Sequence, residues 1–380
     1  MTIPIDELLD DVPALELSDP LGMLPAVASG AAQVREAALL AREAGVATLA
    51  DDGRPRAVVV CGMGGSAIAG DVLAAVAGSS CPVPVLTHRG YGLPGWVGAA
   101  DLVIAVSCSG STEETLSALE EAVRRGCRLL VVGAVDSPAA DLGARGRAVF
   151  VPVTQGRQPR ATVWALSTPL VIAGHALGLL QADEDAVEAT AVQLEQVALR
   201  CRLDAGHFVN PAKALALELS GSLPLVWGTS PLAGTASYRF ACQLNENAKT
   251  PAVWGVLPEA NHNQVVAFDG PFAGSAGSAD DFFRDRLDDD VAERTRLRLV
   301  LLRDTEEHAQ VARRAAVSQE LAQERGIGVS TIVAEGQSSF ERIASLVGLT
   351  DWASTYLALL EGRDPTPVDA ITALKERIRR

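Results

Sequence analysis

Two short segments of the sequence combine glycine with hydroxyl side chains and could hold a phosphate group. The first is residues 62–66 (GMGGS), which stand between an apolar run and a helical pattern. Glycines such as Gly64 and Gly65 let the backbone approach a phosphate, and a helix N-terminus offers free N–H groups with partial positive charge. Ser66 can donate its hydroxyl as well. The segment predicts a phosphate site, although a tight turn without a ligand would use the same residues.

A similar glycine pattern opens the dinucleotide-binding fold, which is the main alternative for this segment. That fold requires an acidic residue about 20 positions further on, at the end of the second strand. Here the second apolar run ends in Thr87-His88-Arg89. The sequence therefore disfavours NAD, and we expect no cofactor.

The second segment is residues 107–112 (SCSGST), which follow an apolar run and precede an acidic helix start. Its hydroxyls and amides could wrap a phosphate without a lysine. The alternative is a capping box, in which Ser or Thr at the N-cap is followed three residues later by Glu. Capping alone does not need so many hydroxyls. Because both segments follow strands, we expect them at the carboxyl ends of neighbouring strands, where they would form one phosphate cradle.

Three later segments each carry one group that could take part in proton transfer or charge stabilisation. They are QPRAT with Arg160, LNENAKT with Glu246 and LPEANHN with His262. A lone arginine is usually a solvated surface charge, and the glutamate could belong to a polar helix face. A lone histidine is more often structural, but one flanked by asparagines in a loop is a candidate acid or base.

The elements that must position these residues alternate between strands and helices. Continuous apolar runs are typical of parallel strands buried on both faces, and their alternation with helices indicates a doubly wound α/β fold. The first group of predicted strands is 57–61, 83–87, 102–107, 129–132 and 149–153. The pattern then restarts, and the second group is 223–227, 253–256, 264–268, 298–302 and 330–333.

This repetition predicts two domains of the same architecture with helical extensions at both ends. We assign 1–50 to an N-terminal arm and helix, 51–190 to a first domain, 191–352 to a second, and 353–380 to a C-terminal turn and helix. A stretch rich in Gly, Ser and Asp at 270–289 is expected to be an exposed loop. A length of 380 residues suits two domains of ordinary size.

Composition narrows the range of partners and compartments. A net charge of −15 with scattered acids argues against nucleic acid or an anionic membrane as partner, because either would need a basic face. Six cysteines without a CxxC pair indicate reduced thiols in a cytosolic protein, and five widely spaced histidines predict no metal site. We find no signal peptide and no apolar stretch of membrane-spanning length, so a soluble cytoplasmic protein is expected.

Taken together and in order, five segments resemble the bifunctional phosphoglucose/phosphomannose isomerase family of the sugar isomerase (SIS) superfamily. The segments are CGMGGSAIAGD, SCSGSTEET, QPRAT, LNENAKTPA and LPEANHN. The resemblance extends from about Val58 to the C-terminus. It implies two SIS domains, a homodimer, and active sites shared between domains and subunits.

The resemblance also implies a role for each matched residue. Arg160 matches the active-site arginine of the family and Glu246 the proton-transferring base. His262 matches the ring-opening histidine, and Lys375 in the terminal helix matches the ring-opening lysine. Thr366, in the DPTP turn, is implied to shape the pocket around the sugar C2 hydroxyl. The phosphate-binding positions are matched by Ser66, Ser107, Ser109 and Thr112.

Three positions depart from the family pattern. Ser111 replaces the usual Asn, Cys108 replaces a frequent Tyr, and Gln264 stands where an acid commonly follows NHN. All three are peripheral to the chemistry. We expect them to affect efficiency and substrate preference before activity.

The function implied is aldose–ketose isomerisation of glucose 6-phosphate and mannose 6-phosphate to fructose 6-phosphate through a cis-enediol, with neither metal nor nucleotide. One alternative is an SIS isomerase for another sugar phosphate, such as a pentose or heptose phosphate, and the NENAK and NHN segments argue against it. The other is a non-catalytic sugar-phosphate-binding protein. Such a protein would keep the serines but has no reason to keep the other four groups, which are Glu246, His262, Arg160 and Lys375.

Overall fold

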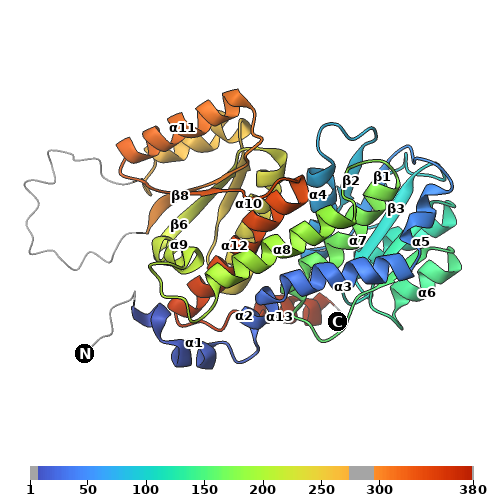
Figure 1. Ribbon diagram of the computed structural model, residues 1–380, viewed down its shortest axis with the longest axis horizontal. Coiled ribbons are helices and arrows are strands. Elements are labelled where there is room, and N and C mark those ends of the chain that lie inside the picture. Colours follow the sequence, from blue (N-terminus) through green and yellow to red (C-terminus); the bar gives the residue numbers. More distant parts are fainter. Residues whose placement is uncertain (1–6, 274–294, 379–380) are drawn as a thin grey trace, which may run out of the picture. The chain divides into compact units, whose positions relative to one another are not determined.

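The computed structural model describes residues 7–273 and 295–378, which form two compact units (Figure 1). The first unit comprises Ala26–Gln196 and Glu335–Ser345. The second unit comprises the other described residues, 7–25, 197–273, 295–334 and 346–378. Two helices, α8 (Glu184–Cys201) and α12 (Ser339–Leu360), begin in the first unit and end in the second.

The first unit is built on a five-stranded parallel sheet in the order β2-β1-β3-β4-β5. Its strands are β1 (Val58–Cys61), β2 (Val85–His88), β3 (Leu102–Ser107), β4 (Arg128–Gly133) and β5 (Val149–Pro152). Its helices are α3 (Gly30–Glu43), α4 (Gly65–Ala77), α5 (Glu113–Arg124), α6 (Pro138–Arg145) and α7 (Val163–Ala176).

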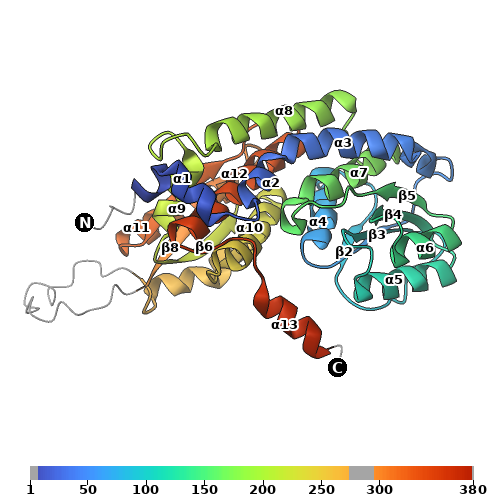
Figure 2. The same ribbon diagram turned by 90° about the horizontal axis from the view of Figure 1, so that it is seen from below.

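Helices cover both faces of this sheet, which explains why its central strands are apolar except at their ends, as at Ser107 and Arg128. Every residue of β1 and β3 is buried. On one face, alternate residues such as Val103 and Ala105 pack with α5 and α6, for example with Leu119 and Ala139. Figure 2 shows α5 and α6 on that side and α3 and α7 on the opposite side of the sheet. This is the doubly wound arrangement expected from the sequence.

The second unit contains a four-stranded parallel sheet in the order β7-β6-β8-β9. Its strands are β6 (Ser222–Gly228), β7 (Val253–Val256), β8 (Arg296–Arg303) and β9 (Gly328–Val333). Residues of β8 such as Leu299 and Leu301 pack with Ala315 and Ala322 of α11 (Ala309–Glu324). The remaining helices of this unit are α1 (Val12–Ser18), α9 (Pro211–Leu219), α10 (Pro231–Gln243) and α13 (Asp369–Ile378). Helix α2 (Met23–Ala28) spans the boundary between the units.

Short irregular helices complete the architecture. The 3-10 helices are η1 (Glu7–Asp10), η2 (Val46–Ala50), η3 (Pro159–Ala161), η5 (Glu259–His262) and η6 (Gln264–Asp269). Between α10 and β7 lies one π-helical turn, η4 (Leu244–Ala248). Two parallel sheets with helical extensions confirm the predicted fold class. The predicted loop at 270–289 falls mostly on 274–289, which lie outside the described residues.

One predicted strand was wrong, because residues 264–268 form the 3-10 helix η6. The Asn263 side chain caps this helix by accepting a hydrogen bond from the Gln264 backbone N–H at 2.6 Å. The Gln264 side chain accepts from Trp227 Nε1 at 2.6 Å and donates to the Trp254 carbonyl at 2.9 Å. These side-chain bonds hold the segment against the edge of the sheet without adding it as a strand, and an apolar run alone cannot reveal them.

Helix α12 corrects the expectation that no apolar stretch is long enough to span a membrane. With 22 residues, α12 is long enough and apolar enough to cross a membrane. Among the described helices it is the one that meets both conditions. Its most apolar window is 94% buried inside the protein. That degree of burial is typical of a core helix, and the apolar surface is covered by protein.

Candidate active site

The two glycine- and serine-containing segments lie side by side at the carboxyl ends of the neighbouring parallel strands β1 and β3. The Ser66 hydroxyl accepts a hydrogen bond from the Cys108 backbone N–H at 3.4 Å. Within the second segment, the Ser107 and Thr112 hydroxyls are hydrogen-bonded at 3.1 Å. The fold therefore gathers these side chains at one edge of the first sheet, which we call the cradle: Ser66, Ser107, Ser109 and Thr112.

Two helices begin at this same edge. Helix α4 starts at Gly65, within the first segment, and α5 starts at Glu113, directly after the second segment. In the described structure the N-cap residue Thr112 makes no side-chain capping bond to α5, and its hydroxyl is directed to Ser107 instead. The capping box considered from the sequence is therefore not formed by Thr112. The Thr112 side chain therefore does not cap the first N–H groups of α5, which are groups of the kind that bind anions.

Glycines are required at two points of the cradle by geometry. Gly64 has φ +52°, a backbone conformation that side chains disfavour, and it turns the chain into α4. Gly110 has φ +67°, and a Cβ there would lie 2.1 Å from the Ser137 hydroxyl. That hydroxyl caps α6 by accepting from the Ala140 N–H. The second loop can thus pack against α6 only if position 110 carries no side chain.

Arg160 lies on η3, beside the beginning of α4. A Cβ on Gly65 would be 3.9 Å from the Pro159 carbonyl oxygen, which shows how close the two backbones are. The segment is held by Gln33 of α3, whose amide donates to the Ala161 carbonyl at 2.7 Å. The first unit by itself therefore places the segment of Arg160 next to the cradle.

Cys108 sits within the cradle but does not have the properties of a nucleophile. Burial raises the pKa of its thiol above the usual value. A raised pKa keeps the group as a thiol at neutral pH, whereas a nucleophilic cysteine is a thiolate. We conclude that Cys108 packs against the first segment and contributes its backbone N–H to Ser66.

In the second unit, Glu246 lies in the π-helical turn η4, which continues α10. Its neighbour Asn247 is buried and donates its side-chain amide to the Ser354 hydroxyl of α12 at 3.0 Å. Further up α10, Arg239 forms a buried ion pair with Asp351 of α12 at 2.6 Å. Single π-turns inside helices occur frequently at functional sites, and this one holds the glutamate half-buried.

The other candidates of the second unit lie on separate segments. His262 ends η5 and is exposed, and the neighbouring Asn261 donates to the Ser318 hydroxyl of α11 at 2.8 Å. Thr366 stands in the DPTP turn, where its backbone N–H donates to the Asp364 carboxylate at 2.9 Å. Lys375 lies on α13, which has no buried residue within its described length.

Comparison with known proteins decides the family. A curated bifunctional phosphoglucose/phosphomannose isomerase from Caldicellulosiruptor bescii is 33% identical over 84% of this chain and 89% of its own length. The chain belongs to the bifunctional phosphoglucose/phosphomannose isomerase family. The relative from Aquifex aeolicus is 30% identical over 86% of this chain and 91% of its own. The family model for the bacterial phospho-glucose isomerase C-terminal SIS domain matches residues 208–378.

The fold agrees with solved structures of sugar-phosphate enzymes. A glucose-6-phosphate isomerase from Chlamydia trachomatis superposes with a TM-score of 0.70 at 13% identity, covering 99% of this chain and 84% of that one. At such low identity this superposition supports the fold alone. The enzyme class is supported by the curated relatives. The expectation of an isomerase with SIS architecture is confirmed, and the non-catalytic alternative is set aside.

Within this isomerase, the structure brings some of the predicted site residues together. The cradle residues and the segment of Arg160 assemble within the first unit. In the second unit, the segments of Glu246 and Thr366 are joined by Lys249, whose ammonium bonds to the backbone of both. The roles of Arg160, Glu246, His262, Lys375 and Thr366 remain predictions.

Sequence reasoning missed Lys249 and Arg363 as parts of the site region. Lys249 was visible only as the last residue of the NENAK segment. Its partners Asp364 and Pro365 lie 115 and 116 residues away, so no local pattern could have revealed them. Arg363, which bonds to the Ala248 carbonyl at 2.5 Å, carried no signal in the sequence.

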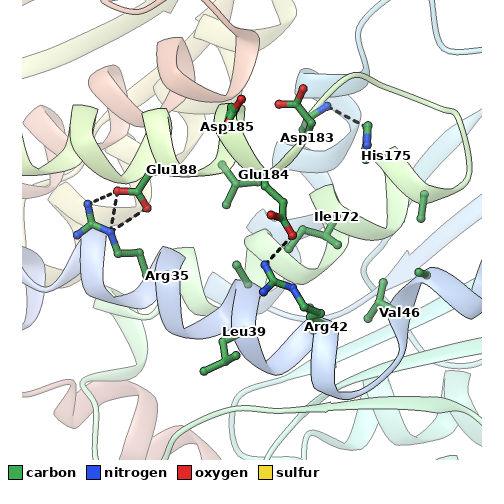
Figure 3. Close-up of a pocket in the computed structure, with 16 residues that line it drawn as sticks. Arg35, Leu39, Arg42, Val46, Ile172, His175, Asp183, Glu184, Asp185 and Glu188 are labelled. Carbon is green, nitrogen blue, oxygen red and sulfur yellow. Dashed lines mark hydrogen bonds and ion pairs between the residues drawn. The ribbon is translucent and has the colours of Figure 1, made fainter.

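A separate cavity of about 670 Å³ in the isomerase shares no residue with the cradle. It lies between α3, η2, α7 and the start of α8, and Figure 3 shows apolar side chains such as Leu39 and Ile172 along its walls. Its arginines are neutralised, because Arg35 pairs with Glu188 at 2.6 Å and Arg42 with Glu184 at 2.8 Å. Such a lining does not suit a sugar phosphate.

Proposed function

We propose that this isomerase interconverts glucose 6-phosphate and mannose 6-phosphate with fructose 6-phosphate. The observation that carries the proposal is the cradle, where two glycine- and serine-containing segments and two helix N-termini meet at one edge of the first sheet. A phosphate dianion suits that combination of hydroxyls, N–H groups and helix dipoles. The curated relatives from Caldicellulosiruptor bescii and Aquifex aeolicus are bifunctional phosphoglucose/phosphomannose isomerases, which supports the same substrates.

In this proposal the phosphate anchors the substrate and Glu246 moves the proton. Its carboxylate removes the proton from C2 of the open-chain aldose, and a cis-enediolate forms across C1 and C2 with its negative charge on the C1 oxygen. The C2 hydroxyl proton then passes to the C1 oxygen, Glu246 returns its proton to C1, and the C2 oxygen becomes the carbonyl of the ketose. Both C2 epimers pass through the same enediol, so one site serves glucose and mannose phosphates. Binding energy from the phosphate helps to position the reacting carbons.

Negative charge develops on the oxygen of the intermediate and must be stabilised. We assign that task to Arg160, because a fixed guanidinium is effective where charge develops in the transition state. The position of its segment beside the start of α4, and hence beside the proposed phosphate site, supports the assignment.

Ring opening requires one group at the ring oxygen and another at the anomeric hydroxyl. We assign these steps to His262 and Lys375, with Thr366 shaping the pocket near C2. We further propose a homodimer in which His262 serves the site of the partner subunit. The exposure of His262 and Lys375 in the single chain supports this assignment. We also propose that the enzyme is cytoplasmic. We propose that it binds neither nucleic acid nor membrane, because its net charge is −15.

A coupled assay tests the proposed function. The purified chain is incubated with fructose 6-phosphate, and glucose 6-phosphate and mannose 6-phosphate are measured by separate reporter enzymes. We expect both aldoses. Formation of neither, together with turnover of a pentose or heptose phosphate, would favour the alternative SIS isomerase.

A further inference from the structure

Lys249 occupies a backbone conformation that lysine rarely adopts. It follows the π-helical turn η4 with φ +57° and ψ +26°, in the left-handed region. Glycine or asparagine is usual there, because the side chain of other residues crowds the backbone. A strained conformation persists only where surrounding contacts enforce it, and such positions cluster at functional sites. The contacts of the Lys249 side chain therefore need an explanation.

The Lys249 ammonium lies among four backbone carbonyl oxygens. Two belong to the turn that carries the candidate base, namely those of Glu246 at 2.9 Å and Asn247 at 3.2 Å. The other two belong to the C-terminal segment, namely those of Asp364 at 3.3 Å and Pro365 at 3.2 Å. We call this arrangement the carbonyl cage. The left-handed backbone at position 249 and these four contacts therefore occur together in the same residue.

The carbonyl cage forms at the C-terminal end of a helix, where backbone carbonyl groups can accept hydrogen bonds from a cation. The last carbonyl groups of a helix lack intrahelical partners and carry partial negative charge, which an ammonium compensates. Here the same ammonium also satisfies carbonyls of a second segment. Charge-assisted hydrogen bonds are stronger than neutral ones, so one side chain can hold two backbones together.

A second cation, Arg363, links the same two segments, but its side chain comes from the C-terminal segment. Arg363 of the C-terminal segment donates to the Ala248 carbonyl of η4 at 2.5 Å and also pairs with Glu361. Lys249 thus extends from the turn to the C-terminal segment, and Arg363 extends from the C-terminal segment to the turn. On its other side the turn is anchored to α12 through the Asn247–Ser354 hydrogen bond.

We propose that Lys249 is a positioning residue that fixes the backbone of Glu246 relative to the C-terminal segment. That segment carries Thr366 and leads directly into α13 with Lys375. The inference rests on the proposed roles of Glu246 and Lys375. Through the cage, the group that transfers the proton and the segment that supplies the ring-opening lysine are held in one geometry. Lys249 itself does not contact the substrate in this scheme.

The decisive variant is Lys249→Gly, because glycine accepts the left-handed backbone and removes the whole side chain together with its ammonium. If the ammonium had no role, this substitution would relieve strain and leave catalysis unchanged. We expect kcat to fall between about tenfold and a hundredfold, since a small misplacement of a reacting group can cost that much. KM should stay within about threefold, because the phosphate is bound in the first unit. Lys249→Arg, which keeps a cation, should recover part of the loss.

Arg147→Gly is the matched control. Arg147 also has a positive φ, +55°, and is exposed, but it lies in the turn before β5 and outside the proposed site. It should leave kcat and KM unchanged. Arg363→Met removes the other cation and should lower kcat in the same way as Lys249→Gly, which keeps the proposal testable if the glycine variant does not fold.

Hydrogen–deuterium exchange separates this inference from the proposed function. In Lys249→Gly, amides of residues 364–378 should exchange faster than in the wild type, whatever the reaction. Unchanged kcat in Lys249→Gly, or a rise in KM alone, would overturn the positioning role. If the wild type lacked isomerase activity, or if Glu246→Gln kept it, the proposed function would fail and the positioning role with it. The exchange data would still decide whether the cage holds the segment.

Discussion

At the scale of single residues, the cradle provides a comparison between two threonines of the same helix region. Thr112 is hydrogen-bonded to Ser107 at the N-terminus of α5, whereas Thr115 lies one turn further along α5 and is buried. The Thr115 hydroxyl has no partner among the described residues. Substituting Thr115 therefore tests the general effect of losing a threonine hydroxyl. Substituting Thr112 tests the effect of losing a hydroxyl at the proposed phosphate site.

We predict that Thr112→Val raises KM for fructose 6-phosphate by about ten- to a hundredfold. Valine keeps the shape, but a hydrogen bond to a charged group contributes roughly 1.5–3 kcal/mol. Thr115→Val should leave KM unchanged and should not destabilise the fold, because it removes an unsatisfied hydroxyl. Steady-state kinetics measures both. Equal KM values for Thr112→Val and the wild type would place the phosphate elsewhere.

At the scale of elements, the position of η4 depends on how α10 packs against α12. The Arg239 guanidinium bonds to both carboxylate oxygens of Asp351, at 3.0 and 2.6 Å, and both side chains are buried. Gln243, one turn further along α10, also donates to Asp351 at 3.3 Å. Burial raises the pKa of Asp351, an effect that its hydrogen bonds and the arginine counteract.

Asp351→Asn should lower the free energy of unfolding by about 3–5 kcal/mol, because it leaves the Arg239 charge buried without a counter-charge. The exposed pair between Arg35 and Glu188 offers the contrast, since Glu188→Gln should cost no more than about 1 kcal/mol. Urea denaturation of the three proteins measures the difference. A loss at Asp351 as small as that at Glu188 would mean that the buried pair does not hold α10 to α12.

Local signals explain which elements could be predicted from the sequence. Strands such as β3 (Leu102–Ser107) and β7 (Val253–Val256) were predicted at their observed bounds, because they are short apolar runs bounded by turn residues. The run at 264–268 is also short and mostly apolar, but it forms a 3-10 helix and not a strand. Its conformation is held by long-range hydrogen bonds of Gln264 to Trp227 and Trp254. The cradle was predictable because each segment is continuous in sequence.

The carbonyl cage was not predictable for the opposite reason. It joins Lys249 to residues more than a hundred positions away, and it depends on a left-handed backbone that propensity assigns to glycine. A lysine after a polar helix end reads as solvated surface. Contacts of this kind become visible only when the fold is known.

At the scale of the whole molecule, the proposed homodimer makes a prediction about mixtures of inactive variants. Glu246→Gln and His262→Ala should each be almost inactive as homodimers. If His262 serves the partner's site, a mixed dimer contains one site with both mutations and one site with neither. Random pairing gives about half mixed dimers, so unfolding and refolding the variants together should restore roughly a quarter of wild-type activity.

Native mass spectrometry of the refolded mixture provides the necessary control, because it shows whether mixed dimers have formed. Mixed dimers without recovered activity would mean that His262 acts in its own subunit. The same spectra test the dimer itself. A monomer at catalytic concentrations would contradict the shared site.

The role of Glu246 is tested most directly by following proton transfer from C1 of fructose 6-phosphate to C2 of the aldose products in deuterated water. Fructose 6-phosphate is incubated with the wild type, Glu246→Gln and Thr115→Val, and the products are analysed by NMR. With the wild type and Thr115→Val, we expect glucose 6-phosphate and mannose 6-phosphate that carry deuterium at C2. With Glu246→Gln we expect neither product, although the substrate still binds. Deuterium entering C2 at the normal rate in Glu246→Gln would contradict the account, because another group would then be the base.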